Sequence, residues 1–201
     1  MPAPGTMVVF VDANVWHSRT LRDWVGRLYT LAETPPFEVR WTEDVMAEVL
    51  YSLRRKHPNW DGGRITRIRD LLQSTFEVGR VESFPMDERY QGKDPLDAHV
   101  HAAAVACGAG ILLTCNVSDF VWDEDTAPYD VLHPDAFLTL LDDSAPELIR
   151  AATLSMNQYW FSKTGSANLP ARLKKAGCPE FAERVRRHTQ GQEHALLKTT
   201  D

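Results

Sequence analysis

Two short, uninterrupted apolar runs, residues 7–11 and 111–114, constrain the fold of this 201-residue chain more than any other feature. Each run is too short for an ordinary helix and gives way to polar residues on its carboxyl side. A strand that is apolar on both faces belongs in a parallel sheet covered by helices on both sides. We therefore expect these two segments to be buried parallel strands.

The segments around these runs alternate between helical and strand patterns. Thr42 is expected to cap a helix, because acidic residues fill the first turn that follows it. The other helices are expected from Leu21 to Ala32, after Gly62-Gly63, from Asp94 to the C′ glycine Gly108, and from Pro134 to Asp142. Further strands are expected at 37–41 and 129–132, with 78–84 either a strand or an extended loop. Such alternation predicts an α/β fold with a central, mostly parallel sheet flanked by helices.

The character of the chain changes after Asp143, where the alternation stops. We expect two units, 1–142 as the main domain and 143–201 as a small C-terminal helical extension. Within the extension, 146–160 and 179–188 are expected to be helices joined by a linker at 165–168. The polar tail beyond Gln190 is expected to fray.

Composition is that of a globular chain, with 43% hydrophobic and 25% charged residues. No stretch approaches the roughly 20 apolar residues that a membrane helix needs. The first residues contain neither a basic segment nor a long apolar run. A signal peptide is therefore not expected, and we expect a cytoplasmic location. The three cysteines form no C-x-x-C pair, which favours buried thiols over a disulfide or zinc site.

The net charge of −6 argues against nucleic-acid binding by bulk positive charge. It does not exclude nucleic acid as a partner. A cluster of carboxylates that recruits divalent cations presents positive charge locally, whatever the total charge of the protein.

Four acidic residues stand where such a cluster could form. Asp12 follows the first strand, Asp119 follows the 111–114 strand, Asp97 lies in the first turn of a helix, and Glu48 is expected at the half-buried rim of another. Ligand sites of parallel sheets lie beyond the carboxyl ends of the strands, so these side chains are expected to converge there. Oxygen-only ligands suit Mg²⁺ or Mn²⁺. Two such ions, roughly 4 Å apart, can activate water and stabilise a leaving oxygen in phosphodiester hydrolysis.

Each acid also has a purely structural interpretation. Asp12 would cap a helix, Asp97 would complete a capping box, and Asp119 would cap a short segment at 120–123. Glu48 alone would be a solvated surface acid, and Asp94 is assigned mainly to helix capping. Only the combination of these residues points to a site.

Four segments carry a family resemblance. They are VDANVW from Val11, EDVMAEVL from Glu43, DPLDAHVHAAAVACGAGILLT from Asp94 and TCNVSDF from Thr114. In this order and spacing they resemble the PIN-domain family and, within it, the VapC-like toxin ribonucleases, over about residues 7 to 142. The later stretch LPARLKKAGCPEFAERVRRH is similar to a C-terminal helical extension found in some members.

The resemblance implies an endoribonuclease that uses Mg²⁺ or Mn²⁺. It implies in-line attack of metal-bound hydroxide on a backbone phosphate, leaving a 5′-phosphate and a 3′-hydroxyl. The metal-binding acids carried over by motif are Asp12, Glu48, Asp97 and Asp119. Asn14 and Thr114 match positions that orient acids or metal-bound waters, and Asn116 is a supporting candidate. An RNA substrate, a cognate antitoxin protein and a possible homodimer are also implied.

One position departs from the family pattern. The third motif commonly places a basic residue after its acid, as in D-R-H, whereas Ala98 stands there in this chain and His99 follows it. The histidines show no metal-ligand spacing, and we interpret His99 and His101 as residues of the core edge or the surface. Contact with substrate at this position is expected to be weaker or supplied by other residues.

Other functions remain as alternatives. One alternative is a catalytically inactive PIN-fold module that binds RNA or protein. Such a module would have the same fold but would not hydrolyse RNA. A haloacid-dehalogenase-type phosphatase needs a second aspartate two residues after the first, where this chain has Asn14. A nucleotide-binding Rossmann protein needs a glycine-rich loop after the first strand, and none is present.

RNA-contacting residues are less well defined by sequence. Trp16 and Trp122 follow acidic motifs and are candidates for base stacking, with core packing preferred for Trp16. The basic candidates form three groups: Arg54, Arg55 and Lys56; Arg64, Arg67 and Arg69; and Arg184, Arg186 and Arg187. The sequence does not distinguish those that contact RNA from those that lie on solvated helix faces.

Overall fold

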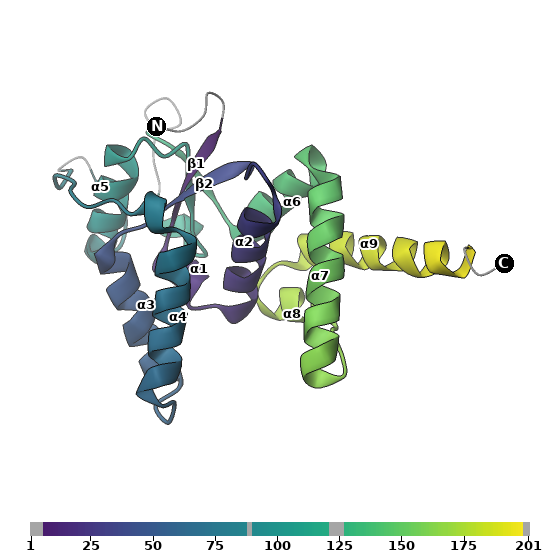
Figure 1. Cartoon of the computed structure of the whole chain (residues 1–201). Helices are drawn as coiled ribbons and strands as arrows, with labels where there is room; N and C mark the ends of the chain where they lie inside the picture. Colours follow the sequence, from purple (N-terminus) through teal and green to yellow (C-terminus); the bar gives the residue numbers. More distant parts are fainter. Residues whose placement is uncertain (1–5, 88–89, 121–126, 199–201) are drawn as a thin grey trace.

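The chain forms one sheet of four parallel strands in the order β2-β1-β3-β4, flanked by helices (Figure 1). The computed structural model describes residues 6–87, 90–120 and 127–198. The strands are β1 (Met7–Val11), β2 (Phe37–Arg40), β3 (Ile111–Leu113) and β4 (Asp130–Leu132). The predicted α/β fold with a parallel sheet is confirmed.

The two apolar runs occupy the centre of the sheet. In the register of β1 and β3, Val9 pairs with Ile111 and Val11 pairs with Leu113. Both strands therefore end at the same level, and the polar residues that follow them emerge at the same edge. A backbone bond of 3.0 Å from the Asp12 N–H to the Leu113 carbonyl extends this alignment by one residue.

Helices α1 (Ala13–Trp16), α2 (Arg19–Leu31), α3 (Glu43–Lys56) and α4 (Gly62–Thr75) pack around the first half of the sheet. The Thr42 hydroxyl accepts a hydrogen bond of 3.2 Å from the Val45 N–H, which confirms the predicted cap of α3. Helices α3 and α4 lie side by side as a hairpin whose turn is at the bottom of Figure 1.

One detail of this region differs from the sequence prediction, and the choice that the sequence left open at 78–84 is resolved in favour of a loop. Gly62 and Gly63 do not separate two helices but form the first turn of α4, because the Asp61 carboxylate caps it through the Arg64 N–H at 2.9 Å. The segment after α4 is not a strand. It consists of a single 3₁₀ turn η1 (Glu77–Gly79), one bridge between Trp41 and Arg80, and irregular chain.

Gly79 explains why this segment runs so close to the sheet. A Cβ atom at this position would lie 1.9 Å from the Val39 carbonyl oxygen, so no larger residue fits without moving the backbone. The Gly79 carbonyl in turn accepts a bond of 3.1 Å from the Trp41 N–H at the end of β2.

The second half of the sheet is completed by α5 (Ala98–Ala106) and α6 (Pro134–Ser144). Short 3₁₀ turns η2 (Pro95–Asp97) and η3 (Val117–Asp119) lie on either side of α5 and β3 in the chain. Gly108 has a φ of 65°, as expected of the glycine that ends α5.

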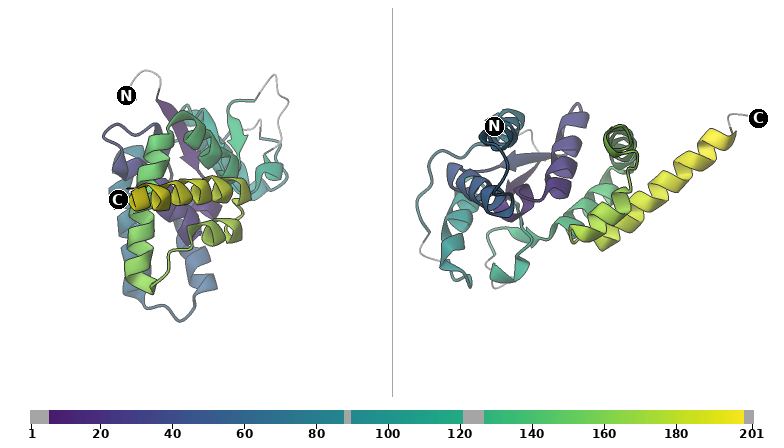
Figure 2. Two further views of the ribbon diagram at one scale, coloured as in Figure 1. Left: turned by 90° about the vertical axis from the view of Figure 1, so that its right-hand side faces the viewer. Right: turned by 90° about the horizontal axis from the view of Figure 1, so that it is seen from below.

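The C-terminal helices are α7 (Pro146–Thr164), α8 (Leu169–Lys175) and α9 (Pro179–Lys198). The predicted fraying beyond Gln190 is wrong, because α9 continues to Lys198. Its far end projects away from the rest of the chain (Figure 2). No helix in the described ranges is long and apolar enough to cross a membrane.

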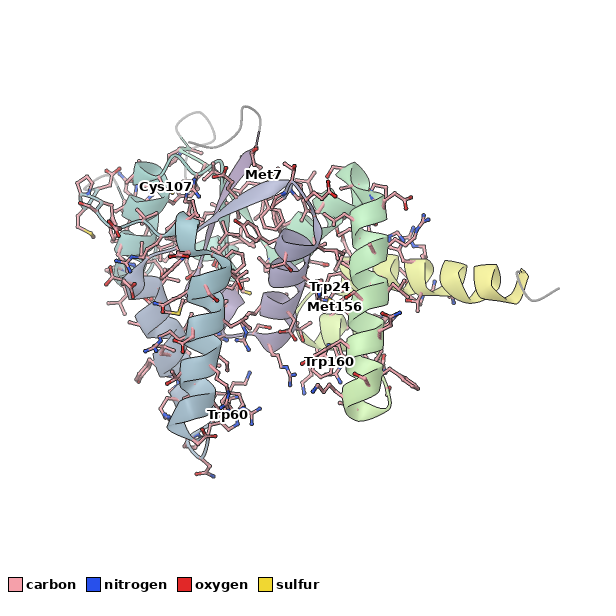
Figure 3. All side chains as sticks on the ribbon, in the orientation of Figure 1. Met7, Trp24, Trp60, Cys107, Met156 and Trp160 are labelled. Carbon is pink, nitrogen blue, oxygen red and sulfur yellow. The ribbon has the colours of Figure 1, made fainter. Side chains whose placement is uncertain are left out.

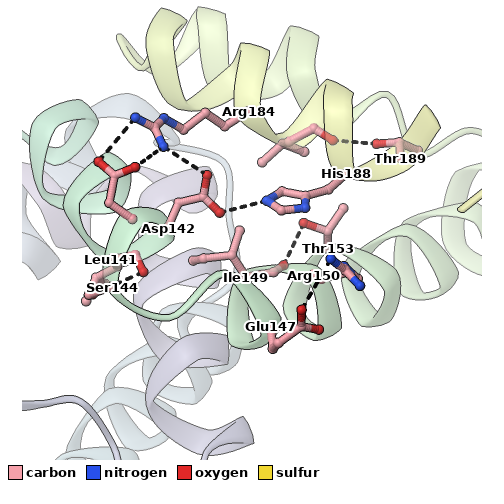
Figure 4. Close-up of polar contacts among 12 residues, drawn as sticks. Leu141, Asp142, Ser144, Glu147, Ile149, Arg150, Thr153, Arg184, His188 and Thr189 are labelled. Atoms are coloured by element: carbon pink, nitrogen blue, oxygen red, sulfur yellow. Dashed lines mark hydrogen bonds and ion pairs between the residues drawn. The ribbon is translucent and has the colours of Figure 1, made fainter. Parts of the chain in front are cut away.

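These helices share the core of the sheet domain. The Phe181 ring of α9 and the Trp24 ring of α2 are fully buried and make an edge contact with centroids 4.8 Å apart. The buried Asp142 carboxylate of α6 lies 2.7 Å from the His188 ring and accepts a bond from Arg184, both on α9 (Figure 4). Packing is therefore continuous across residue 143, and the division into two units at that point stays a prediction.

The shared core predicts that Phe181→Ala destabilises the whole chain. Removal of a buried aromatic ring is expected to lower the free energy of unfolding by about 3–5 kcal/mol. Denaturant unfolding followed by circular dichroism should show one cooperative transition at lower denaturant. Phe161→Ala on α7 is the control, since that ring is 66% exposed. Two separate transitions, with the larger one unchanged, would show that α9 is not part of this core.

Candidate functional site

Asp12 is the most firmly held of the predicted acids. It lies directly after β1 and is 5% exposed. One carboxylate oxygen accepts a bond of 2.5 Å from the Ala13 N–H and caps α1. The other accepts bonds from the Thr114 hydroxyl at 2.7 Å and the Asn14 amide at 2.5 Å. Asp12 can therefore cap α1 and also belong to a site, because the capping bond uses one carboxylate oxygen and the bonds from Thr114 and Asn14 use the other.

Asn14 joins the two chain segments that leave the sheet. Its side-chain carbonyl accepts a bond of 2.9 Å from the Cys115 N–H, and its amide also donates to the Thr114 hydroxyl at 2.9 Å. Asn116 differs, since its contact with Thr114 is made by its backbone N–H at 3.0 Å and its side chain is exposed. Asn14 and Thr114 thus orient Asp12 directly, and Asn116 supports that arrangement through the backbone.

Asp97 does not cap a helix. The Asp94 carboxylate accepts the bond from the Leu96 N–H at 2.9 Å and caps η2, as predicted. The capping-box interpretation of Asp97 is wrong, since within the described residues the Asp97 carboxylate accepts no bond from the Asp94 N–H. The physical reason is the 3₁₀ turn, which winds the backbone between Asp94 and Asp97 more tightly than the α-helical first turn in which a capping box forms. Its carboxylate is consequently left for other partners.

The acids are close enough to change one another's ionisation. Burial raises the pKa of Asp97 to about 6, with further increases from the negative charges of Asp12, Asp94, Asp119 and Glu48. Burial also raises the pKa of Asp12, an effect opposed by the hydrogen bond from Thr114. The structure therefore brings the four predicted acids into mutual electrostatic range at the carboxyl edge of the sheet.

Glu48 and His99 form a pair that the sequence did not predict. The His99 Nε2 atom lies 2.7 Å from a carboxylate oxygen of Glu48, across the space between α3 and α5. The Glu48 side chain is 48% exposed, which agrees with the half-buried rim position expected for it. His99 follows Asp97 by two residues, so the one signal available was its place in the third motif. In the part of the chain that is described, its buried Nδ1 atom has no hydrogen-bond partner.

Asp119 ends η3 and is half-buried. Its carbonyl accepts a bond of 3.1 Å from the Lys93 N–H, which ties the two loops of the site together. The alternative role of Asp119 as a cap for 120–123, and the stacking role of Trp122, involve residues 121–126 outside the described ranges. Trp16 is buried and packs on Phe76 at 5.1 Å, which confirms core packing for that residue.

A family model for the PIN domain matches residues 8–118, more than half of the chain. The chain belongs to the PIN-domain family. The matched region contains Asp12, Glu48 and Asp97 and ends one residue before Asp119. PIN domains are generally nucleases that bind nucleic acid and use divalent metals, so the chain has a nuclease-type fold. Comparisons with curated proteins and with solved structures give no match.

The acids of the PIN-domain site have the ligand atoms that a divalent cation needs, but among the described residues their side chains are not arranged around one point. Its acids offer the hard oxygen ligands that Mg²⁺ and Mn²⁺ prefer. Within the described ranges, however, no three His, Cys, Asp or Glu side chains surround a common point that could hold one ion. Burial, and after it the negative charges of the neighbouring acids, raise the pKa of Asp97. Bringing the carboxylates together around a cation would relieve that repulsion.

The pKa of Asp97 predicts how stability varies with pH. Because the folded-state value of about 6 exceeds the ordinary 3.8, the folded state binds this proton more tightly than the unfolded chain. The resulting stabilisation is complete below pH 3.8 and is lost as the pH rises through 6. The variant Asp97→Asn has no such carboxyl group and does not lose this stabilisation. We expect the free energy of unfolding of the variant, relative to that of the wild type, to be higher at pH 8 than at pH 4 by about 2 kcal/mol after allowance for solvent screening.

Denaturant unfolding in EDTA at pH 4, 6 and 8 measures this difference. Asp130→Asn, at the exposed amino end of β4, is the control because it removes an acid from the opposite edge of the same sheet. An Asp97→Asn protein whose stability follows the same pH curve as the wild type would refute the raised pKa of Asp97.

Proposed function

We propose that the chain is a metal-dependent endoribonuclease that hydrolyses RNA phosphodiester bonds. The observation that carries the proposal is the combination of a buried, hydrogen-bonded Asp12 with Asp97, Asp119 and Glu48 in electrostatic range at the carboxyl edge of a PIN-domain sheet. A cluster of this kind repels a polyanion when it is alone and attracts one when cations neutralise it.

Asp12, Glu48, Asp97 and Asp119 would hold Mg²⁺ or Mn²⁺. When bound, such ions supply charge neutralisation at the scissile phosphate and lower the pKa of water. The remaining chemistry is positioning. Thr114 and Asn14 fix the direction of the Asp12 carboxylate, and His99 holds Glu48 in one orientation at the solvent side of the site.

A covalent cysteine mechanism is not supported. Cys115 is the thiol nearest in sequence to the acids, and its N–H bonds to Asn14. Burial and the charge of Asp12 raise the pKa of the Cys115 thiol to about 11, so the nucleophilic thiolate is scarce near neutral pH. This favours water as the attacking group.

A narrower part of the proposal is that the chain is the toxin of a type II toxin–antitoxin pair. Its support is the likeness of the four motif segments, and of the 169–188 stretch, to VapC-like toxins with a C-terminal extension. The expected partners are a cognate antitoxin and a second copy of the chain. Expression alone should arrest growth, and co-expression of the neighbouring reading frame should relieve the arrest. Normal growth on expression alone would remove the toxin role and leave the nuclease role standing.

One alternative has a specific observation in its favour. A catalytically inactive PIN-fold module that binds RNA or protein would need neither a converged ligand set nor a basic residue after Asp97. Within the described residues no converged set is present, and the position after Asp97 is Ala98. RNA cleavage decides between the two functions.

Asp12→Asn tests the nuclease function. We expect cleavage of unstructured RNA by the purified full-length chain in Mg²⁺ or Mn²⁺, none in EDTA, and a loss of roughly a thousandfold in the variant, since a displaced metal is worth several kcal/mol in the transition state. Asp119→Asn serves as a second variant if Asp12→Asn folds poorly, and Asp130→Asn is the matched control. Metal-independent cleavage, or cleavage that survives in both site variants, would contradict the proposal.

A further inference from the structure

Several basic residues lie near the turn of the α3–α4 hairpin, and the sequence alone did not distinguish those that contact RNA from those that do not. Three of them make contacts within the hairpin. Arg54 donates to the Trp60 carbonyl at 2.6 Å, and the Arg64 guanidinium lies 3.7 Å from the centre of the Trp60 ring. Arg69 forms an ion pair of 2.7 Å with its neighbour Asp70. Arg54 and Arg64 therefore hold the turn of the hairpin and keep their positive charge, whereas Arg69 neutralises Asp70.

The remaining basic residues of the hairpin are not neutralised. Arg55, Lys56 and Arg67 are exposed, and their side chains make no hydrogen bond or ion pair with any residue in the described ranges. Trp60, which is held between these two helices, marks the far end of the hairpin (Figure 3). In a chain of net charge −6, this end of the molecule is a local concentration of positive charge.

The positive end is joined to the acidic site by one face of α3. Glu48, Tyr51 and Arg55 stand at positions i, i+3 and i+7, which share a face of an α-helix. The rise of 1.5 Å per residue places Arg55 about 10.5 Å along the axis from Glu48. Tyr51 lies between them and is 67% exposed, an unusual position for an aromatic ring without a partner surface. The order along the face is acid, aromatic ring, cation.

We infer that this face of α3 is the track along which single-stranded RNA leaves the acidic site, with a base stacked on Tyr51 and phosphates bound by Arg55 and Lys56. The inference rests on the proposed function, since it takes RNA as the substrate of the neighbouring acids. Single-stranded nucleic acid is recognised by this combination of aromatic platform and cationic groove. An acidic protein segment would match the cations, but nothing in such a segment requires a planar ring in line with the catalytic acids.

The charge of the track is tested by Arg55→Gln/Lys56→Gln in the full-length chain. Binding of a fluorescently labelled, unstructured RNA is measured by anisotropy in EDTA at several salt concentrations, so that divalent ions do not mask counterion release. We expect about a tenfold or greater rise in Kd at low salt. We also expect the slope of log affinity against log salt to become shallower by about 1.4, or 0.7 for each lost phosphate contact.

Lys174→Gln/Lys175→Gln is the matched control. These lysines are also adjacent, exposed and in the last turn of a helix, α8, so the change in net charge and helix context is the same. The control should keep the wild-type Kd and slope. Tyr51→Ala should weaken binding by roughly tenfold without changing the slope, because stacking releases no counterions.

Cleavage separates a failure of the track from a failure of the nuclease function. In Mg²⁺, Arg55→Gln/Lys56→Gln should raise KM for a long RNA and leave kcat unchanged, and it should have no effect on a dinucleotide that cannot reach Arg55. A wild type that binds RNA through these residues without cutting it would support the track and overturn the nuclease function. Equal Kd and slope in the double variant, its control and the wild type would overturn the track, whether or not RNA is cut, and would leave an acidic protein as the partner of this surface.

Discussion

The parallel alignment of β1 and β3 brings the residues that follow both strands to one point at the edge of the sheet. Because Val11 pairs with Leu113, Asp12 and Thr114 leave the sheet at the same level, and the Thr114 hydroxyl meets the Asp12 carboxylate at 2.7 Å. Asn14 closes the same network between the two segments. Two strands that are distant in sequence thereby fix one carboxylate at the sheet edge, around which α3, η2 and η3 place the other acids.

Burying the Asp12 carboxylate near other acids makes it harder for these groups to ionise together. Burial of Asp97 raises its pKa, and the negative charges of Asp12, Asp94, Asp119 and Glu48 raise it further. The fold tolerates this repulsion because the capping bond from Ala13 and the bond from Thr114 stabilise the ionised form of Asp12. Such stored repulsion at an open sheet edge is what a cation-binding site looks like before its cation is bound.

The sequence predicted those parts of the fold and site that depend on local chemistry. Continuous apolar runs revealed β1 and β3, and the residues after them revealed Asp12. The pairing of His99 with Glu48 could not be predicted, because it depends on how α5 packs across from α3. Asp97 was misread as a cap because a 3₁₀ first turn leaves no mark in the sequence, and 78–84 was ambiguous because its path is set by the approach of Gly79 to β2.

Calorimetric titration of Mn²⁺ into the full-length chain at pH 7 measures whether the neighbouring carboxylates bind a cation. We expect saturable binding that is lost in Asp12→Asn and Asp119→Asn and retained in Asp130→Asn. Binding should also release protons at pH 6, because Asp97 has a pKa of about 6 and must ionise to hold the metal. Absence of Mn²⁺ binding by the wild type, or equal binding by Asp12→Asn, would contradict this expectation.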